Sequence, residues 1–120
     1  MLTEISDNYV HCSSHSIRRL RERFDFFALK SNYFCMRFLE QNVDKSEIVI
    51  ESREKHHRWY GRTARYYRHT YQGTPLEMFF IVSPDNIVVT VLTKIQFLAL
   101  MEDTLHLKRY HALLYKIANA

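Results

Sequence analysis

The spacing of apolar side chains predicts helices in the first third of the chain. Ser13 and Ser14 can cap a helix over His15–Phe24, because their hydroxyls accept hydrogen bonds from the free backbone amides of the first turn. A second helix is predicted over Phe26–Gln41. Its apolar positions are Phe27, Leu29, Phe34, Met36, Phe38 and Leu39. So broad an apolar set predicts that the second helix is buried on more than one side.

From Glu47 onward the apolar spacing changes to a period of two, which is typical of strands. The predicted strands are 48–50, 57–60, 65–71, 76–82 and 87–92, with a short lead-in strand at 9–12. Gly73 supplies a positive φ in one of the connecting turns. The β-branched strand at 87–92 is expected in the middle of the sheet. Short turns between consecutive strands predict an antiparallel meander of about four strands.

The last quarter of the chain returns to helical spacing. Thr93 and Gln96 form a capping-box pattern, so a helix is expected to continue to about Met101. Glu102–Thr104 can break it, and a last helix ends near Ala118. The packing stripe of that last helix consists of Leu105, Tyr110, Leu113, Leu114 and Ile117. A chain of 120 residues without a linker predicts a single α+β domain spanning residues 1–120.

Composition and net charge indicate the kind of partner that the chain could bind. Apolar residues make up 47% of the chain, an ordinary globular share, and the net charge of +4 favours an acidic partner. Cys12 and Cys35 lack metal-site spacing and are expected to be reduced thiols in the cytoplasm. No apolar run is long enough for a membrane span, and the polar start is not a signal peptide. We therefore expect a cytoplasmic protein without a membrane partner; export within a larger effector is the alternative.

The most distinctive motif places His15, Arg19 and Arg23 at four-residue intervals. On a helix these side chains form one file, a turn apart, and their mutual repulsion suggests that an anion or carboxylates face them. A helix start also favours an anion and weakens the affinity of an imidazole for its proton. A solvated basic face is the alternative interpretation.

A second basic stretch, rich in aromatic residues, runs from Arg53 to Tyr71. Strand alternation predicts that Arg65, Tyr67, His69 and Tyr71 share one face, which could contact phosphates and stack unpaired bases. The candidate nucleic-acid-binding residues are Arg58, Tyr60, Arg62, Arg65, Tyr67 and Tyr71. Tyrosine pairs also stabilise sheets without any ligand, so a structural role is the alternative.

The seven histidines do not indicate a metal site. His56 and His57 are adjacent and would point to opposite faces of a strand, and His106 and His111 are not at i, i+4 spacing. No histidine pair has a carboxylate or cysteine at zinc-site spacing, and no phosphate-binding glycine loop is present. We therefore expect neither a metal nor a cofactor.

The helix motif His15–Arg23, followed by the strand Val88–Leu92, resembles small bacterial and phage proteins of RelE-like fold. This superfamily also groups the barnase, EndoU and colicin nucleases and RegB-like phage endoribonucleases, and the resemblance extends over residues 15–93. It implies a metal-independent endoribonuclease of toxin or phage RNA-processing type, in which the ribose 2′-hydroxyl attacks the adjacent phosphate. An acidic antitoxin or immunity protein would be a further partner besides RNA.

In such a mechanism His15 can act as acid or base, and the forked guanidiniums of Arg19 and Arg23 suit the phosphate. His69 is the second acid/base candidate. We expect Arg19, Arg23, His69 and a tyrosine of the 65–71 strand to line one groove. Two alternatives are a non-catalytic nucleic-acid-binding module and an interaction protein that docks an acidic partner.

Overall fold

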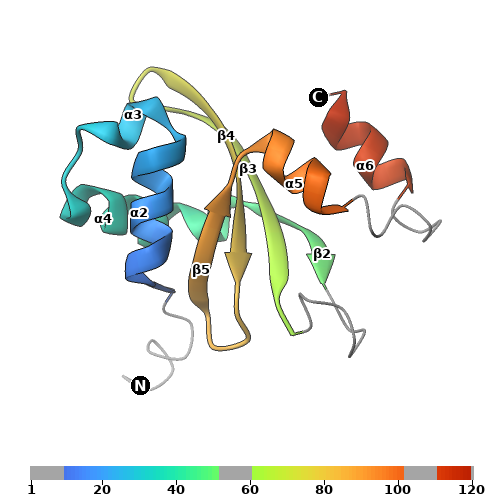
Figure 1. Cartoon of the computed structure of the whole chain (residues 1–120), viewed down its shortest axis with the longest axis horizontal. Coiled ribbons are helices and arrows are strands. Elements are labelled where there is room, and N and C mark those ends of the chain that lie inside the picture. Colours follow the sequence, from blue (N-terminus) through green and yellow to red (C-terminus); the bar gives the residue numbers. More distant parts are fainter. Residues whose placement is uncertain (1–9, 52–60, 102–110, 120) are drawn as a thin grey trace.

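The computed structural model of the chain describes residues 10–51, 61–101 and 111–119. Within them a five-stranded sheet, in the order β1-β5-β4-β3-β2, carries helices on both faces, as Figure 1 shows. The elements in chain order are β1 (His11–Cys12), α2 (Ser14–Arg23), α3 (Asp25–Ala28), α4 (Asn32–Asn42), the 3₁₀ turn η1 (Val43–Lys45), β2 (Glu47–Glu51), β3 (Thr63–Tyr71), β4 (Thr74–Val82), β5 (Ile87–Leu92), α5 (Lys94–Met101) and α6 (His111–Ala118). The predicted α+β class is confirmed.

Strands β2 to β5 form the predicted antiparallel meander, and β1 adds a short parallel strand outside β5. The prediction that β5 lies in the middle of the sheet is wrong, because β4 occupies that place. Helices cover both faces of the sheet, so β5 is buried from above and below although it lies near the edge. A β-branched sequence indicates that both faces of a strand are covered. It does not indicate where in the sheet the strand lies.

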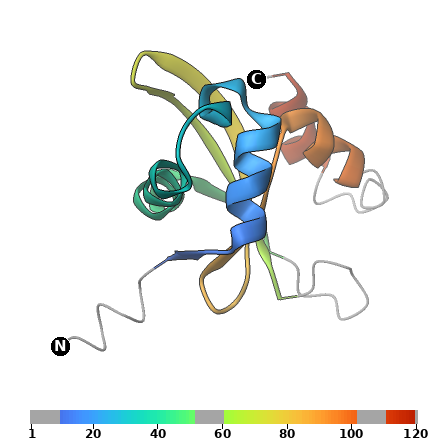
Figure 2. The ribbon, with the colours of Figure 1, turned by 60° about the vertical axis from the view of Figure 1, so that its left-hand side comes forward.

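Side-chain alternation along the strands divides the interior into two apolar layers. Tyr67, Met78 and Phe80 pack toward α2, α3 and α4, whereas Phe79 and Ile81 pack toward α5 and α6. Figure 2 views the sheet nearly edge-on, with α4 on one side and α5 and α6 on the other. The middle strand β4 therefore has an almost continuous apolar sequence, as expected for a strand buried on both faces.

The long second helix predicted for residues 26–41 is wrong, because the chain forms two helices, α3 and α4, with a bend between them. Ser31 causes the break by capping α4: the amide of Phe34 donates to Ser31 Oγ at 3.0 Å. A serine hydroxyl can accept a hydrogen bond from a nearby backbone amide and so start a new helix, and Ser31 does so here. Leu29, a predicted core residue, lies in the bend and is 98% exposed.

The other predicted helix starts and turns agree with the structure. Ser13 Oγ accepts from the amide of Ser16 at 3.0 Å. Gln96 Oε1 accepts from the Thr93 amide at 3.0 Å, and Thr93 Oγ1 accepts from the Gln96 amide at 3.2 Å, which completes the capping box. Gln72 (φ 50°) and Gly73 (φ 80°) both have positive φ, as a tight hairpin turn requires.

Some predictions fall on parts of the chain that the structure does not describe. They are the strand at 57–60, the break at Glu102–Thr104, and the packing roles of Leu105 and Tyr110. The backbone of Leu113 and Leu114 is described as part of α6, but their side chains are not. None of the helices in the described residues has the length and apolar character needed to cross a membrane.

Candidate nucleic-acid interface

Helix α2 lies along the outer edge of β5 and is bonded to it at both ends. At its start, Ser13 Oγ donates to the carbonyl oxygen of Val88 at 3.0 Å. At its end, Arg23 Nη1 donates to the carbonyl oxygen of Val91 at 2.7 Å. The carbonyl of Val88 also accepts from the Ser13 amide at 3.1 Å, whereas that of Val91 lies beyond the pairing with β1. The two bonds together fix the rotation of α2 about its own axis.

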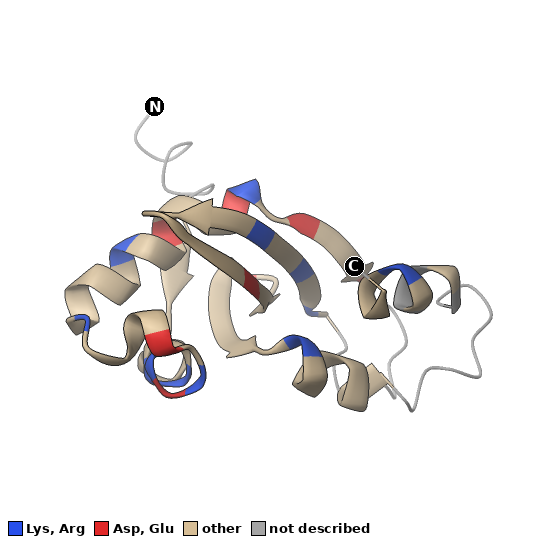
Figure 3. Cartoon of the chain, turned by 90° about the horizontal axis from the view of Figure 1, so that it is seen from above, with Lys and Arg blue, Asp and Glu red and all other residues tan. Residues whose placement is uncertain are grey.

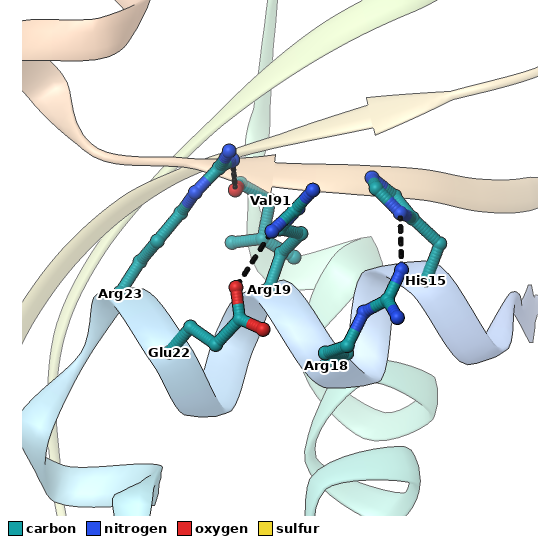
Figure 4. Close-up of polar contacts among 6 residues, drawn as sticks. All are labelled: His15, Arg18, Arg19, Glu22, Arg23 and Val91. Atoms are coloured by element: carbon teal, nitrogen blue, oxygen red, sulfur yellow. Dashed lines mark hydrogen bonds and ion pairs between the residues drawn. The ribbon is translucent and has the colours of Figure 1, made fainter.

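That rotation places His15, Arg19 and Arg23 on one side of α2, from which they project toward β5 (Figure 4). The predicted file is therefore confirmed as a geometric feature. Arg19 Nη1 lies 2.6 Å from Glu22 Oε2. Glu22 is the sole carboxylate of α2, whereas the helix carries four arginines, so its net charge is strongly positive (Figure 3). Arg23 bonds a neutral carbonyl, and within the described residues it forms no ion pair.

The imidazole of His15 sits among these cations. Arg18 Nη2 lies 3.5 Å from His15 Nδ1. Desolvation first, and then the positive charges of Arg19, Arg18 and Arg23, lower the pKa of His15 below 6.5, while Glu22 opposes the shift. His15 is therefore predominantly neutral at pH 7 and can accept a proton.

The β3 face expected to stack bases is covered by α4. Alternation along β3 is as predicted, but Tyr67 is only 1% exposed and its ring lies 5.5 Å from that of Phe38. Tyr71 lies 5.0 Å from the same phenylalanine ring. Tyr67 cannot stack a base without opening the core, and Tyr71 is half-buried against the same cluster, so the structure shows no open platform formed by both rings on this face. The tyrosine rings instead supply apolar area to the interior.

Arg65, on the same face, forms hydrogen bonds within the protein. Its Nε donates to Ser46 Oγ at 2.9 Å and its Nη2 donates to the Ser46 carbonyl at 2.9 Å. Its Nε also lies 3.1 Å from the carbonyl oxygen of Val43. Arg65 thus fastens β3 to the end of α4, and it is not directed toward the α2 face.

His69 does not converge with the file on α2. It pairs across the hairpin with Leu76 at one end of β4, whereas α2 begins beside Val88, whose partner is Val82 at the other end of β4. At about 3.3 Å per residue, the span of β4 between these points is about 20 Å. One phosphate cannot meet both His15 and His69, since proton transfer needs hydrogen-bond reach. The expected common groove does not form.

The sequence did not single out a polar network on the opposite face of β3. The hydroxyl of Tyr66 donates to Glu77, and Lys94 Nζ lies 4.0 Å from Glu77 Oε2. Burial, followed by the hydrogen bond and charge of Glu77, raises the pKa of Tyr66 to about 12. Arg68 and Glu77 are directly cross-strand, and that opposite-charge pairing was the available signal. The network joins β3 and β4 to the start of α5.

Of the remaining candidates, Arg62 is partly buried just before β3, and Arg58 and Tyr60 lie outside the described residues. In the described ranges there is no group of His, Cys, Asp or Glu side chains that could hold a metal ion. No family model, curated protein or solved structure matches the chain. The geometry of α2 and its surroundings therefore carries the functional argument.

Proposed function

We propose that the side of α2 bearing His15, Arg19 and Arg23 binds the phosphate backbone of RNA. The observation that carries this proposal is the fixed alignment of the three side chains beside the β5 edge, with one carboxylate on the whole helix. Guanidiniums hold phosphate oxygens bidentately, and backbone contacts supply most non-specific affinity. The resemblance of this motif to small ribonucleases favours RNA among nucleic acids. An acidic protein partner would compete for the same face.

Binding of a labelled single-stranded RNA tests this proposal. Replacing Arg19 by Glu should weaken binding by at least about tenfold, roughly 1.4 kcal/mol, because a phosphate contact becomes a repulsion. The matched control is Lys116→Glu, which makes the same charge change at an exposed position of α6 and should alter the affinity by less than about twofold. Equal losses of RNA affinity in the two variants would mean that α2 contributes only its positive charge and makes no specific contact with the RNA.

RNA cleavage is the second candidate, and the lowered pKa of His15 favours it. A neutral imidazole beside arginines can accept the proton of a ribose hydroxyl while the guanidiniums offset charge on the phosphate. Without His69 this arrangement has a base but no second histidine as acid, so the departing 5′-oxygen would take its proton from water. Incubation of total RNA with chelator should yield cut ends that are lost in a folded His15→Ala variant. If the RNA stays intact, the protein binds RNA without cleaving it.

A further inference from the structure

A second basic feature lies on the other flank of α2, away from β5. There a cleft of about 460 Å³ opens between α2 and the bend that joins α3 to α4. Its basic lining residues are Arg18 and Arg21, which were not part of the file. A volume of this size is in the range of pockets that hold small organic ligands.

Arg21 is held in place by neutral groups. Its Nη1 donates to Asn32 Oδ1 at 3.0 Å and its Nη2 lies 3.4 Å from the carbonyl oxygen of Ala28. Its Nε is buried and has no hydrogen-bond partner. Since Nε is buried, the donors that could face the cleft are the N–H groups of Nη1 and Nη2 that these two bonds do not use. The guanidinium is thus pre-positioned by its neutral partners.

The charge of Arg21 is not cancelled within the described part of the chain, where no ion pair involves Arg18 or Arg21. The positive charge of Arg21 also acts on Cys35: burial raises the pKa of the Cys35 thiol, and that charge opposes the rise. Glu22 also lines the cleft, but its carboxylate is engaged by Arg19 at 2.6 Å.

The rest of the lining defines what the cleft can hold. Ser14 contributes a hydroxyl, and Asn32, whose oxygen is used by Arg21, retains its amide hydrogens as donors. Ile17 and Ala28 supply apolar wall. Two guanidiniums with further donors suit a tetrahedral dianion, and the apolar wall and volume exceed what a bare phosphate needs. We propose that this cleft binds a phosphate monoester with a small organic body, such as a mononucleotide.

Calorimetric titration of the full chain with uridine monophosphate, uridine and inorganic phosphate tests the proposal. We expect saturable binding of uridine monophosphate, weaker binding of inorganic phosphate and none of uridine. Arg21→Gln should reduce the affinity for uridine monophosphate by at least about tenfold. The matched control Arg37→Gln, at an exposed position of α4, should leave it unchanged.

Arg18→Gln keeps the test decisive if Arg21→Gln does not fold, because Arg18 is exposed and its loss removes no packing. It should also lower the affinity. The proposal is overturned if the wild type binds no uridine monophosphate, if both variants bind it as the wild type does, or if inorganic phosphate binds equally well. It does not rest on RNA binding: the titration with uridine monophosphate contains no RNA, so a wild type that binds uridine monophosphate and no RNA would support this proposal and contradict the proposed function.

Discussion

The guanidinium of Arg23 donates to Val91 O at 2.7 Å, at a part of the β5 edge that β1 does not reach. Arg19, one turn earlier, meets only the exposed carboxylate of Glu22. Two arginines of one file therefore have different partners. The first bond replaces a missing strand pairing, and the second is a surface ion pair of small value.

This difference predicts unequal effects on stability. Arg23→Met should lower the free energy of unfolding by about 1–3 kcal/mol, since it leaves a partly buried carbonyl without its charged donor. Arg19→Met should change it by less than about 0.5 kcal/mol. Urea unfolding of both variants measures the difference. Equal stability of the two variants would mean that the Arg23 bond adds nothing to the sheet edge.

At the same scale, the lowered pKa of His15 makes RNA binding depend on pH. In the free protein the imidazole is mostly neutral at pH 7 because its pKa lies below 6.5. A bound phosphate favours the protonated form and raises that pKa, so RNA binding takes up a proton. Affinity should therefore rise as the pH falls from about 7.5 toward the pKa of the free imidazole.

Anisotropy titrations across this pH range, at constant salt, measure the effect. His15→Ala should bind RNA with an affinity that no longer changes with pH. A His15→Ala variant that keeps the full pH dependence would assign the proton uptake to another group.

At the scale of elements, α5 is attached to the sheet through stacked rings. Phe97 is fully buried, and its ring lies 4.0 Å from that of Phe79 with an interplanar angle of 2°. Tyr66 stacks on the other side of Phe79 at 4.8 Å. This stack connects α5 to the β3–β4 hairpin within the apolar layer that also contains Met101.

Shortening the side chain of Phe97 should destabilise the protein. Phe97→Ala is expected to lower the free energy of unfolding by about 3–5 kcal/mol, because it leaves a cavity between helix and sheet. Ile95→Ala, on the same helix but 82% exposed, should cost less than about 0.5 kcal/mol. Thermal or urea unfolding compares the two. A small loss for Phe97→Ala would mean that α5 does not depend on the stack.

Element boundaries show what local sequence can predict. The caps at Ser13 and Thr93 were predicted because each precedes an apolar helical pattern. The cap at Ser31 was missed although Lys30, Ser31 and Asn32 interrupt the apolar residues there, because apolar side chains on both sides of this break were assigned to one helix. The signal for this break is therefore local: a serine that can cap a new helix, within a short polar stretch.

At the scale of the whole molecule, alternation along β3 correctly separated Arg65, Tyr67, His69 and Tyr71 from the other face. Which face the N-terminal helices cover could not be predicted, because arginine, tyrosine and histidine fit both a ligand surface and a half-buried sheet. The separation of His15 from His69 depends on strand order and register. The file on α2 was predictable because it is local to one helix.

The salt dependence of RNA binding tests the central claim most directly, since each phosphate neutralised on a single strand adds about 0.7 to the slope of log K against log salt. With wild-type protein the account predicts a slope of roughly −2, from about three contacts by His15, Arg19 and Arg23 at acidic pH. Arg19→Glu should reduce its magnitude by at least about 0.7, and Lys116→Glu should leave it unchanged. Binding that does not respond to salt, or an Arg19→Glu slope equal to that of the wild type, would contradict the claim that α2 holds the RNA backbone.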